Sequence, residues 1–389
     1  MNAAQSRRLL DLLSLPTAPF REGAIVRHAK KFCTRFGLPY FADDTGNLVI
    51  GAADAKTYRR LITSKTREPL RVFIAHMDHP GFHGERWISP SRLAIRWHGG
   101  SPTKHVQGAR VWLADDTGYA GEGRLANVKL HRAGYSITTA EIRVDGRDLN
   151  SQKAGDFFGG FAFRTPAWKS GKTIYTKAAD DLGGVFAVLE SAKALKNTRE
   201  GKSFIGLLTR AEEVGFVGAI AHFDKLPYQN ANRPIVCVSL ETSRTLPGAV
   251  IGKGPVVRLG DRRGVFNADA LRLFSDLALD ALPKRHQRRI MDGGACEATA
   301  ALAYGLPAIG ISVPLGNYHN QGFEGGPDCR KKLGPAPEFV HLDDLDGMLK
   351  LCRALMRPGL PWGDPWKPQR IRLRRNLARY RKLLSRPAI

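Results

Sequence analysis

The chain has 389 residues, 43% of them hydrophobic, with 41 Gly, 23 Pro and a formal net charge of +24. This length excludes a single small core and predicts a globular protein of two domains. No apolar run approaches the roughly 18 residues of a membrane helix, and the N-terminal residues lack the apolar core of a secretory signal. We therefore expect a cytoplasmic protein without a membrane partner. The charge is compatible with nucleic acid, acidic substrates or anionic surfaces, and it says nothing about the fold.

The five cysteines are odd in number, scattered, and form no C-x-x-C pair. This distribution predicts reduced thiols rather than a disulfide framework.

The first part of the chain, up to about residue 80, predicts two helices and two strands. Helical spacing of apolar residues occurs at 5–13 and 21–36, and a short strand is expected at 47–51. The compact apolar run Arg71–Ala75 ends directly in His76, which is typical of a parallel strand covered on both faces. From about Pro80 to Trp168 only short alternating segments occur, at 93–97, 109–114, 122–130, 141–144 and 157–164. They predict a small all-β domain inserted into an α/β domain.

After residue 174 the pattern alternates again between helix and strand. The expected helices are 182–195, one from about 217, 267–282, 295–304 and 345–355, and the expected strands are 203–209, 234–240 and 308–313. Residues 358–368 read as a linker, and residues 369–385 as a basic amphipathic helix with an apolar stripe of Leu373, Leu377, Tyr380 and Leu384. The stripe predicts that this helix docks on the body or on a partner, with its basic face outward.

These patterns predict an α/β fold with a central, mainly parallel sheet flanked by helices. The expected domains are a discontinuous catalytic domain (1–79 and 169–356), an inserted β domain (80–168), and a linker with the basic C-terminal helix (357–389).

Polar residues that can bind metal follow the predicted strands. His76, Glu212-Glu213 and Glu241 each come after a strand, His319 lies six residues beyond another, and Asp180 immediately precedes Asp181 and the helix 182–195. Ligand sites form at the carboxyl ends of parallel strands, so these side chains can meet at one edge of the sheet. Imidazole and carboxylate ligands suit zinc, manganese or cobalt, and no thiolate set is present. Asp78 can accept the second ring N–H of His76 and fix its orientation.

Each of these residues also has a simpler interpretation. Asp181 can be an ordinary helix cap, His76 a hydrogen-bonded loop histidine, and Glu212-Glu213 a solvated helix start. Only their joint occurrence favours a metal centre.

Several motifs, in this order and spacing, resemble the tetrahedral aminopeptidases, family 42 of the metallopeptidases (the glutamyl aminopeptidase and endoglucanase family), within the clan of di-zinc exopeptidases. The matching segments are Ala75–Phe82, Ala179–Gly184, Glu212–Ala219, Gly252–Pro255, Gly293–Ala295 and Ile311–His319. The chain departs from the family at His79-Pro80, where Glu-Ile is common, at Glu241, where Asp is usual, and at Ala295-Cys296, where Thr-Asp is frequent.

The resemblance implies two divalent metal ions, zinc first and cobalt or manganese as alternatives. Asp180 would bridge them, His76 and Glu241 would complete one site, and Glu213 and His319 the other. Glu212 would be the general base that activates a bridging water, and the Asp180–Asp181 peptide would be cis. The inserted domain would form a dimer contact, and dimers would build a larger homo-oligomer.

The chemistry of the residues agrees with this assignment. Two metal ions about 3.5–4 Å apart can polarise a carbonyl and activate a shared water, and a carboxylate next to a ligand can move the proton. We therefore expect a metallo-aminopeptidase that hydrolyses N-terminal residues from peptides. Two alternatives remain: a metal-dependent amidohydrolase of a small acylated or peptide-like metabolite, and a protein that binds nucleic acid or another polyanion through the basic tail, which is the less favoured.

Overall fold

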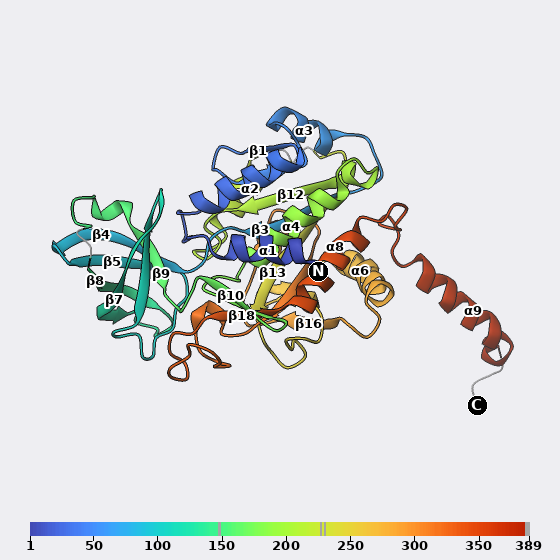
Figure 1. Cartoon of the computed structure of the whole chain (residues 1–389). Coiled ribbons are helices and arrows are strands. Elements are labelled where there is room, and N and C mark those ends of the chain that lie inside the picture. The colour runs from blue at the N-terminus through green and yellow to red at the C-terminus, as the bar shows by residue number, and fades with distance from the viewer. Residues whose placement is uncertain (147–148, 226–227, 229–230, 386–389) are drawn as a thin grey trace.

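The computed structural model describes residues 1–146, 149–225, 228 and 231–385. Its helices and strands alternate around one large sheet, and a β barrel stands to one side of that sheet (Figure 1). None of the helices in the described part of the chain has the length and apolar composition needed to span a membrane. All five cysteines are free, as the sequence predicts.

The large sheet is mixed, with parallel strands at its centre. In spatial order it contains β1 (Tyr40–Ala42), β2 (Leu48–Ile50), β12 (Phe204–Thr209), β3 (Leu70–His76), β13 (Ile235–Arg244), β17 (Ala308–Leu315), β14 (Val256–Asp261) and β15 (Gly264–Val265), and β16 (Gln287–Met291) also pairs with β14. The four strands β12, β3, β13 and β17 run parallel, while β2 and β14 pair with them antiparallel. Strands β3 and β12 are buried along their whole length, which explains their continuous apolar sequences.

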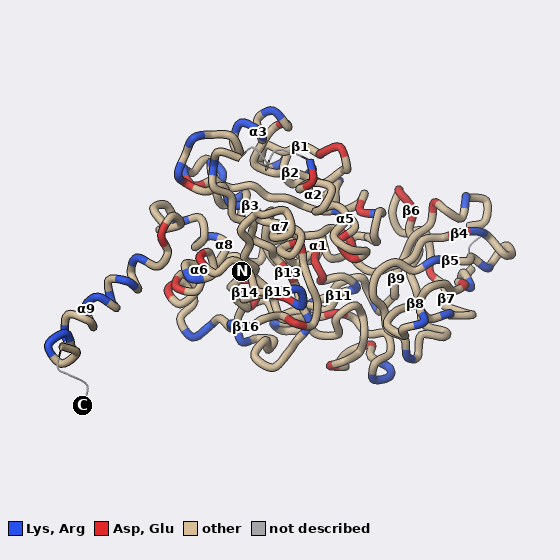
Figure 2. Tube along the Cα trace, turned by 180° about the vertical axis from the view of Figure 1, so that it is seen from behind, with Lys and Arg blue, Asp and Glu red and all other residues tan. Residues whose placement is uncertain are grey.

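Helices cover both faces of this sheet (Figures 1 and 2). The helices are α1 (Ala3–Leu13), α2 (Gly23–Phe36), α3 (Ala55–Thr63), α4 (Leu182–Leu195), α5 (Val217–Asp224), α6 (Ala268–Ala281), α7 (Glu297–Ala303), α8 (Leu342–Leu355) and α9 (Lys367–Leu384). Helix α4 packs against β3, β12 and β13, with α1, α2 and α8 around it, and α7 packs with α5 and against β13 and β17. The observed α/β architecture confirms the fold class predicted from the sequence.

The strands between residues 81 and 161 form a closed barrel. They are β4 (Gly81–Ser89), β5 (Arg92–His98), β6 (Arg110–Asp115), β7 (Gly118–Leu130), β8 (Ile137–Val144) and β9 (Phe158–Phe161), in the order β4-β5-β8-β7-β6-β9. The barrel has its own apolar core, which includes Phe82, Leu113 and Phe157. A third, three-stranded sheet contains β10 (Ala167–Ser170), β11 (Thr173–Thr176) and β18 (Glu338–His341). The domain limits and the dimer contact expected for residues 80–168 stay predictions.

Helix α9 extends away from the body (Figure 1). No residue of α9 is buried, and Leu373, Leu377, Tyr380 and Leu384 are all exposed. The expected docking of its apolar stripe on the body is therefore wrong. The last anchored residue before the helix is Trp366, whose indole N–H donates a hydrogen bond to Asp269 (2.8 Å).

Candidate metal centre

The parallel strands bring the predicted ligands to one edge of the sheet. His76 is the last residue of β3 and pairs in register with Thr209, the last residue of β12, so the segment that carries Glu212 and Glu213 starts beside it. Glu241 lies in β13, next to Ser312 of β17. The short 3-10 helix η3 (Tyr318–Asn320), which carries His319, follows β17.

Asp180 lies between the two histidines. Its Oδ1 is 3.5 Å from Nε2 of His76, and its Oδ2 is 3.6 Å from Nε2 of His319. Oε2 of Glu213 is 3.2 Å from the same His319 nitrogen, and Oε2 of Glu212 is 3.9 Å from Nε2 of His76. The side chains that are distant in sequence therefore share one small, buried space.

Two groups of three potential ligands share Asp180. One is His76, Asp180 and Glu241, and the other is Asp180, Glu213 and His319; within each group the ligand atoms lie within 4.8 Å of one another. Glu212 is close to both, since it also groups with His76 and Glu213 and with Glu241 and Glu297.

Asp78 holds the segment that carries the two glutamates. Its carboxylate accepts hydrogen bonds from the backbone N–H of Glu212 (3.0 Å) and of Glu213 (3.1 Å). Its nearer carboxylate oxygen is 3.6 Å from Nδ1 of His76, and its backbone carbonyl is closer to that nitrogen, at 3.2 Å. Asp78 therefore contacts His76, as the sequence suggests, and also orients both glutamates.

The N-terminus of α4 fixes Asp180. The peptide bond between Asp180 and Asp181 is cis. Asp181 caps the helix by accepting the N–H of Gly184 (3.0 Å), so its simpler interpretation as a helix cap also holds. A Cβ atom on Gly184 would lie 2.2 Å from the Asp181 carboxylate, which explains glycine at this position.

Three polar residues to which the sequence analysis assigned no role support this centre. Glu338 of β18 accepts hydrogen bonds from the backbone N–H of Ala179 (2.7 Å), Asp180 (3.1 Å) and His319 (2.8 Å). His79 contacts the carbonyl of Asp180 through Nδ1 (2.7 Å). Glu297 is completely buried and accepts a hydrogen bond from Thr209 (2.7 Å). The only sequence signal for Glu338 is a charged residue at the start of a short apolar strand.

Burial and the neighbouring histidines together set the pKa values of the carboxylates. It raises the pKa of Glu212 and of Glu241 well above the ordinary value, because the charged forms lose solvation. Burial also acts to raise the pKa of Asp180, but the interactions with His319 and His76 outweigh it and hold that pKa low. Conversely, burial acts to lower the pKa of His319, and the neighbouring Glu213 and Asp180 raise it to about 10.

The donor set fits divalent metal ions. Oε1 of Glu213 and Nε2 of His319 are buried and make no aligned hydrogen bond within the described residues, although the two side chains are neighbours. Buried polar atoms without a partner are rare in proteins, and a cation would satisfy both while compensating the crowded carboxylates. Mixed carboxylate and imidazole donors are typical of zinc, manganese and cobalt sites.

A small cavity of about 30 Å³ adjoins the Glu241 side of this centre. Asp180, Glu241, Arg258 and Tyr318 are among its walls.

Comparison with known proteins indicates one family and its fold. A family model described as M42 glutamyl aminopeptidase matches residues 60–322. The TET1 peptidase of Pyrococcus horikoshii, described as assembling into a tetrahedron or a large octahedral shell, is 22% identical with a TM-score of 0.70 over 91% of this chain and 99% of its own. An aminopeptidase of the archaeon Desulfurococcus kamchatkensis is 20% identical with a TM-score of 0.71 over 92% and 97%. An M18 aminopeptidase of Thermotoga maritima is 13% identical with a TM-score of 0.63 over 91% and 96%. No curated protein sequence matches the chain.

Proposed function

The chain belongs to the M42 glutamyl aminopeptidase family and is a metallo-aminopeptidase, and from this premise we propose how its residues carry out the reaction. The observation that carries the proposal is the pair of ligand groups that share Asp180, with Glu212 beside both. This arrangement is suited to two adjacent metal ions and one general base.

We assign one ion to His76, Glu241 and Asp180, and the other to Glu213, His319 and Asp180. Zinc is the first choice of metal, with cobalt or manganese as alternatives, because the donors are nitrogen and oxygen. When bound, such a pair supplies polarisation of the scissile carbonyl and a lowered pKa of an attacking water.

Glu212 is the proposed general base. Its carboxylate accepts a proton from the attacking water and donates it to the nitrogen of the leaving amine. The hydrogen bond from its backbone N–H to Asp78 fixes the position of the Glu212 backbone, from which the side chain extends. Its side chain is nearly buried, so bulk water has little access to the proton during the transfer.

The assembly proposed for the chain is a homo-oligomer built from dimers, with the barrel at the dimer contact. The oligomeric shell described for the Pyrococcus horikoshii relative supports this proposal, and closed oligomers usually form through such symmetric contacts.

A panel of aminoacyl-arylamides and N-acyl amino acids, assayed after metal removal and re-addition of Zn²⁺, Co²⁺ or Mn²⁺, tests the proposed function. We expect hydrolysis of arylamides with a free amine, loss of activity on chelation, and recovery with a divalent ion. Preferential hydrolysis of the N-acyl compounds would instead establish the amidohydrolase alternative. Full activity in metal-free protein would contradict both.

A further inference from the structure

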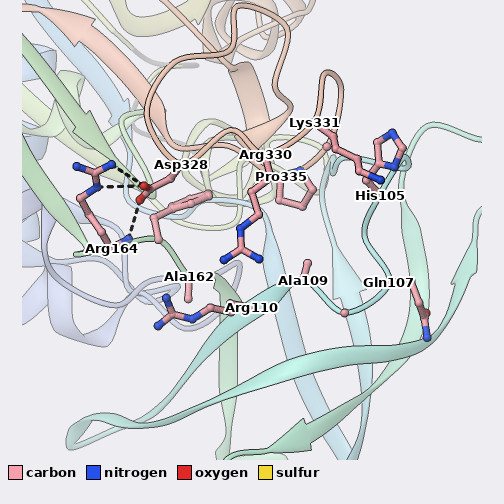
Figure 3. A pocket seen from close by; sticks show the side chains of 13 residues that line it. His105, Gln107, Ala109, Arg110, Ala162, Arg164, Asp328, Arg330, Lys331 and Pro335 are labelled. Atoms are coloured by element: carbon pink, nitrogen blue, oxygen red, sulfur yellow. Dashed lines mark hydrogen bonds and ion pairs between the residues drawn. The ribbon is translucent and has the colours of Figure 1, made fainter.

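A larger, positively charged pocket lies where the barrel meets the catalytic body (Figure 3). Its volume is about 480 Å³. Arg110 of β6 and Arg164, which follows β9, come from the barrel side, whereas Arg330 and Lys331 come from the loop between η3 and β18. Asp328 is the only acidic residue among the described residues that line it.

Two of these cations are already paired and two are not. Arg164 donates two hydrogen bonds to Oδ1 of Asp328 (3.0 and 2.7 Å), and its backbone N–H donates to Oδ2 (2.8 Å), so that carboxylate is fully engaged. Arg110 pairs with Glu122. Arg330 and Lys331 are exposed, and neither side chain has a hydrogen bond or an ion pair with any described residue. In Figure 3 the guanidinium of Arg330 points from its loop toward the β6 side of the pocket.

Both loops that form the pocket begin close to His319. Gly100, in the loop from β5 to β6, lies so close that a Cβ atom on it would be 2.2 Å from Nδ1 of His319. The other loop closes on itself where the N–H of Ala336 donates to the carbonyl of Asn320 (2.8 Å). His105 is five residues from Gly100, and Lys331 is five residues from Ala336, so each lies within about 18 Å of the end of its loop that is near His319.

The two ends of the metal centre therefore differ. The cavity of about 30 Å³ lies at the Glu241 side, and the larger basic pocket is reached from the His319 side. A peptide whose departing part passes His319 would extend toward the basic pocket, and five residues of an extended chain reach about 18 Å.

We propose that this pocket binds a carboxylate on the departing part of the peptide substrate, with Arg330 and Lys331 as its main contacts. The proposal rests on the aminopeptidase function above. An unpaired guanidinium and ammonium favour a carboxylate through charge-assisted hydrogen bonds. The carboxylate can come from an acidic side chain or from the C-terminus of the peptide, and the pocket is thus a specificity site for the substrate residues on the C-terminal side of the scissile bond.

The test uses hexapeptides that share the first residue whose arylamide is hydrolysed fastest. Four versions combine Glu or Gln at position five with a free or an amidated C-terminus. The wild-type protein should hydrolyse at least one carboxylate-bearing version with a kcat/KM about tenfold above that of the amidated Gln peptide, as expected for a charge-assisted contact. The version that gains identifies the source of the carboxylate.

The double variant R330A/K331A should remove this preference through a higher KM, while it leaves the amidated Gln peptide and the arylamide unchanged. The matched control R374A/R375A removes two charges from the exposed helix α9 and should retain the preference. Equal rates for all four peptides in the wild type, or an equal loss in the control, would overturn the proposal. A wild-type protein that hydrolyses neither arylamide nor peptide would instead overturn the proposed function.

Discussion

Among single residues, the proposed metal centre depends on two carboxylates that accept hydrogen bonds from backbone N–H groups. Asp78 holds Glu212 and Glu213, and Glu338 holds Asp180 and His319. Such partners orient ligands and are typically worth 10–100-fold in metal affinity or activity. They are as much a part of the geometry as the ligands that they position.

Glu338→Gln tests this role. A carboxylate accepts hydrogen bonds on both oxygens, whereas an amide presents N–H groups on one side, so at least one of the three backbone donors loses its acceptor. We expect metal affinity and kcat/KM each to fall about 10–100-fold. Calorimetric metal titration and an arylamide assay measure both, and Glu85→Gln in the barrel is the control for charge. Wild-type metal binding in Glu338→Gln would show that Glu338 does not position the ligands.

The sequence could indicate the residues around the centre only where they follow recognisable strands. His76 and Glu241 stand directly after continuous apolar runs, and the structure brings them together with Asp180. Glu338 and His79 could not be found this way. Both contact backbone atoms of Asp180, which is about 100 or more residues away along the chain, and one sequence contains no signal for such partners.

At the scale of elements, the sequence predicts those that bury a continuous face. The sequence predicts helix α4 and the central strands because nearly all of their residues are buried, which requires nearly continuous apolar sequences. Helix α3 was not expected, since only Tyr58 and Ile62 of its nine residues are buried. Strand β4 was also missed because shifts in its register near Gly84 and Trp87 interrupt the alternation of side chains.

Asp43 links the turn between β1 and β2 to helix α5. Its carboxylate accepts hydrogen bonds from Thr45, Asn47 and His222. Burial acts to raise the pKa of Asp43, but the bonds from His222, Asn47 and Thr45 outweigh it and hold the pKa below its ordinary value of 3.8. The lowered pKa means that the ionised carboxylate stabilises the fold above pH 3.8 and that this stabilisation is lost as the pH falls further.

We therefore expect Asp43→Asn to lower the free energy of unfolding by about 1.5–3 kcal/mol near pH 6, the range for hydrogen bonds to a charged group. The difference from wild type should stay constant down to about pH 5 and shrink below pH 4. Urea unfolding across this pH range measures it. The control is Asp44→Asn, since Asp44 is exposed and pairs only with Lys225 among the described residues. A difference in the free energy of unfolding between wild type and Asp43→Asn that grows below pH 4 would contradict stabilisation by the ionised Asp43 carboxylate.

At the scale of the whole molecule, α9 adds charge without adding to the core. Nine of the 60 Lys and Arg residues lie in residues 364–389, and those of α9 are spread along a helix that stands clear of the body (Figure 2). The apolar stripe of α9 does not pack on the body, so only a partner molecule could cover it.

Light scattering at micromolar concentration tests the assembly. We expect a dimer or a larger oligomer both for the full chain and for a chain that ends at Trp366, because the proposed contact is in the barrel. A monomeric full chain would contradict the dimer. An oligomer that is lost only in the shortened chain would assign the contact to α9.

The shortened chain also tests the polyanion alternative. If α9 is the binding site, the full chain should bind duplex DNA and the shortened chain should not. The affinity should fall steeply with salt concentration as counterions are released. Retention by the shortened chain would exclude α9 as the site. Basic helix faces are common without a ligand, so this role is the less favoured one.

The adjacent residues Glu212 and Glu213 are proposed to have different roles, and comparison of Glu212→Gln with Glu213→Gln distinguishes these roles. Metal content and turnover are measured on the same samples. Glu213→Gln should lose metal and activity together. Glu212→Gln should retain metal near the wild-type level and lose about 10²–10⁴-fold in kcat, as expected for removal of a positioned general base. Near-normal turnover in Glu212→Gln, or loss of metal in that variant alone, would contradict the role of Glu212 as general base.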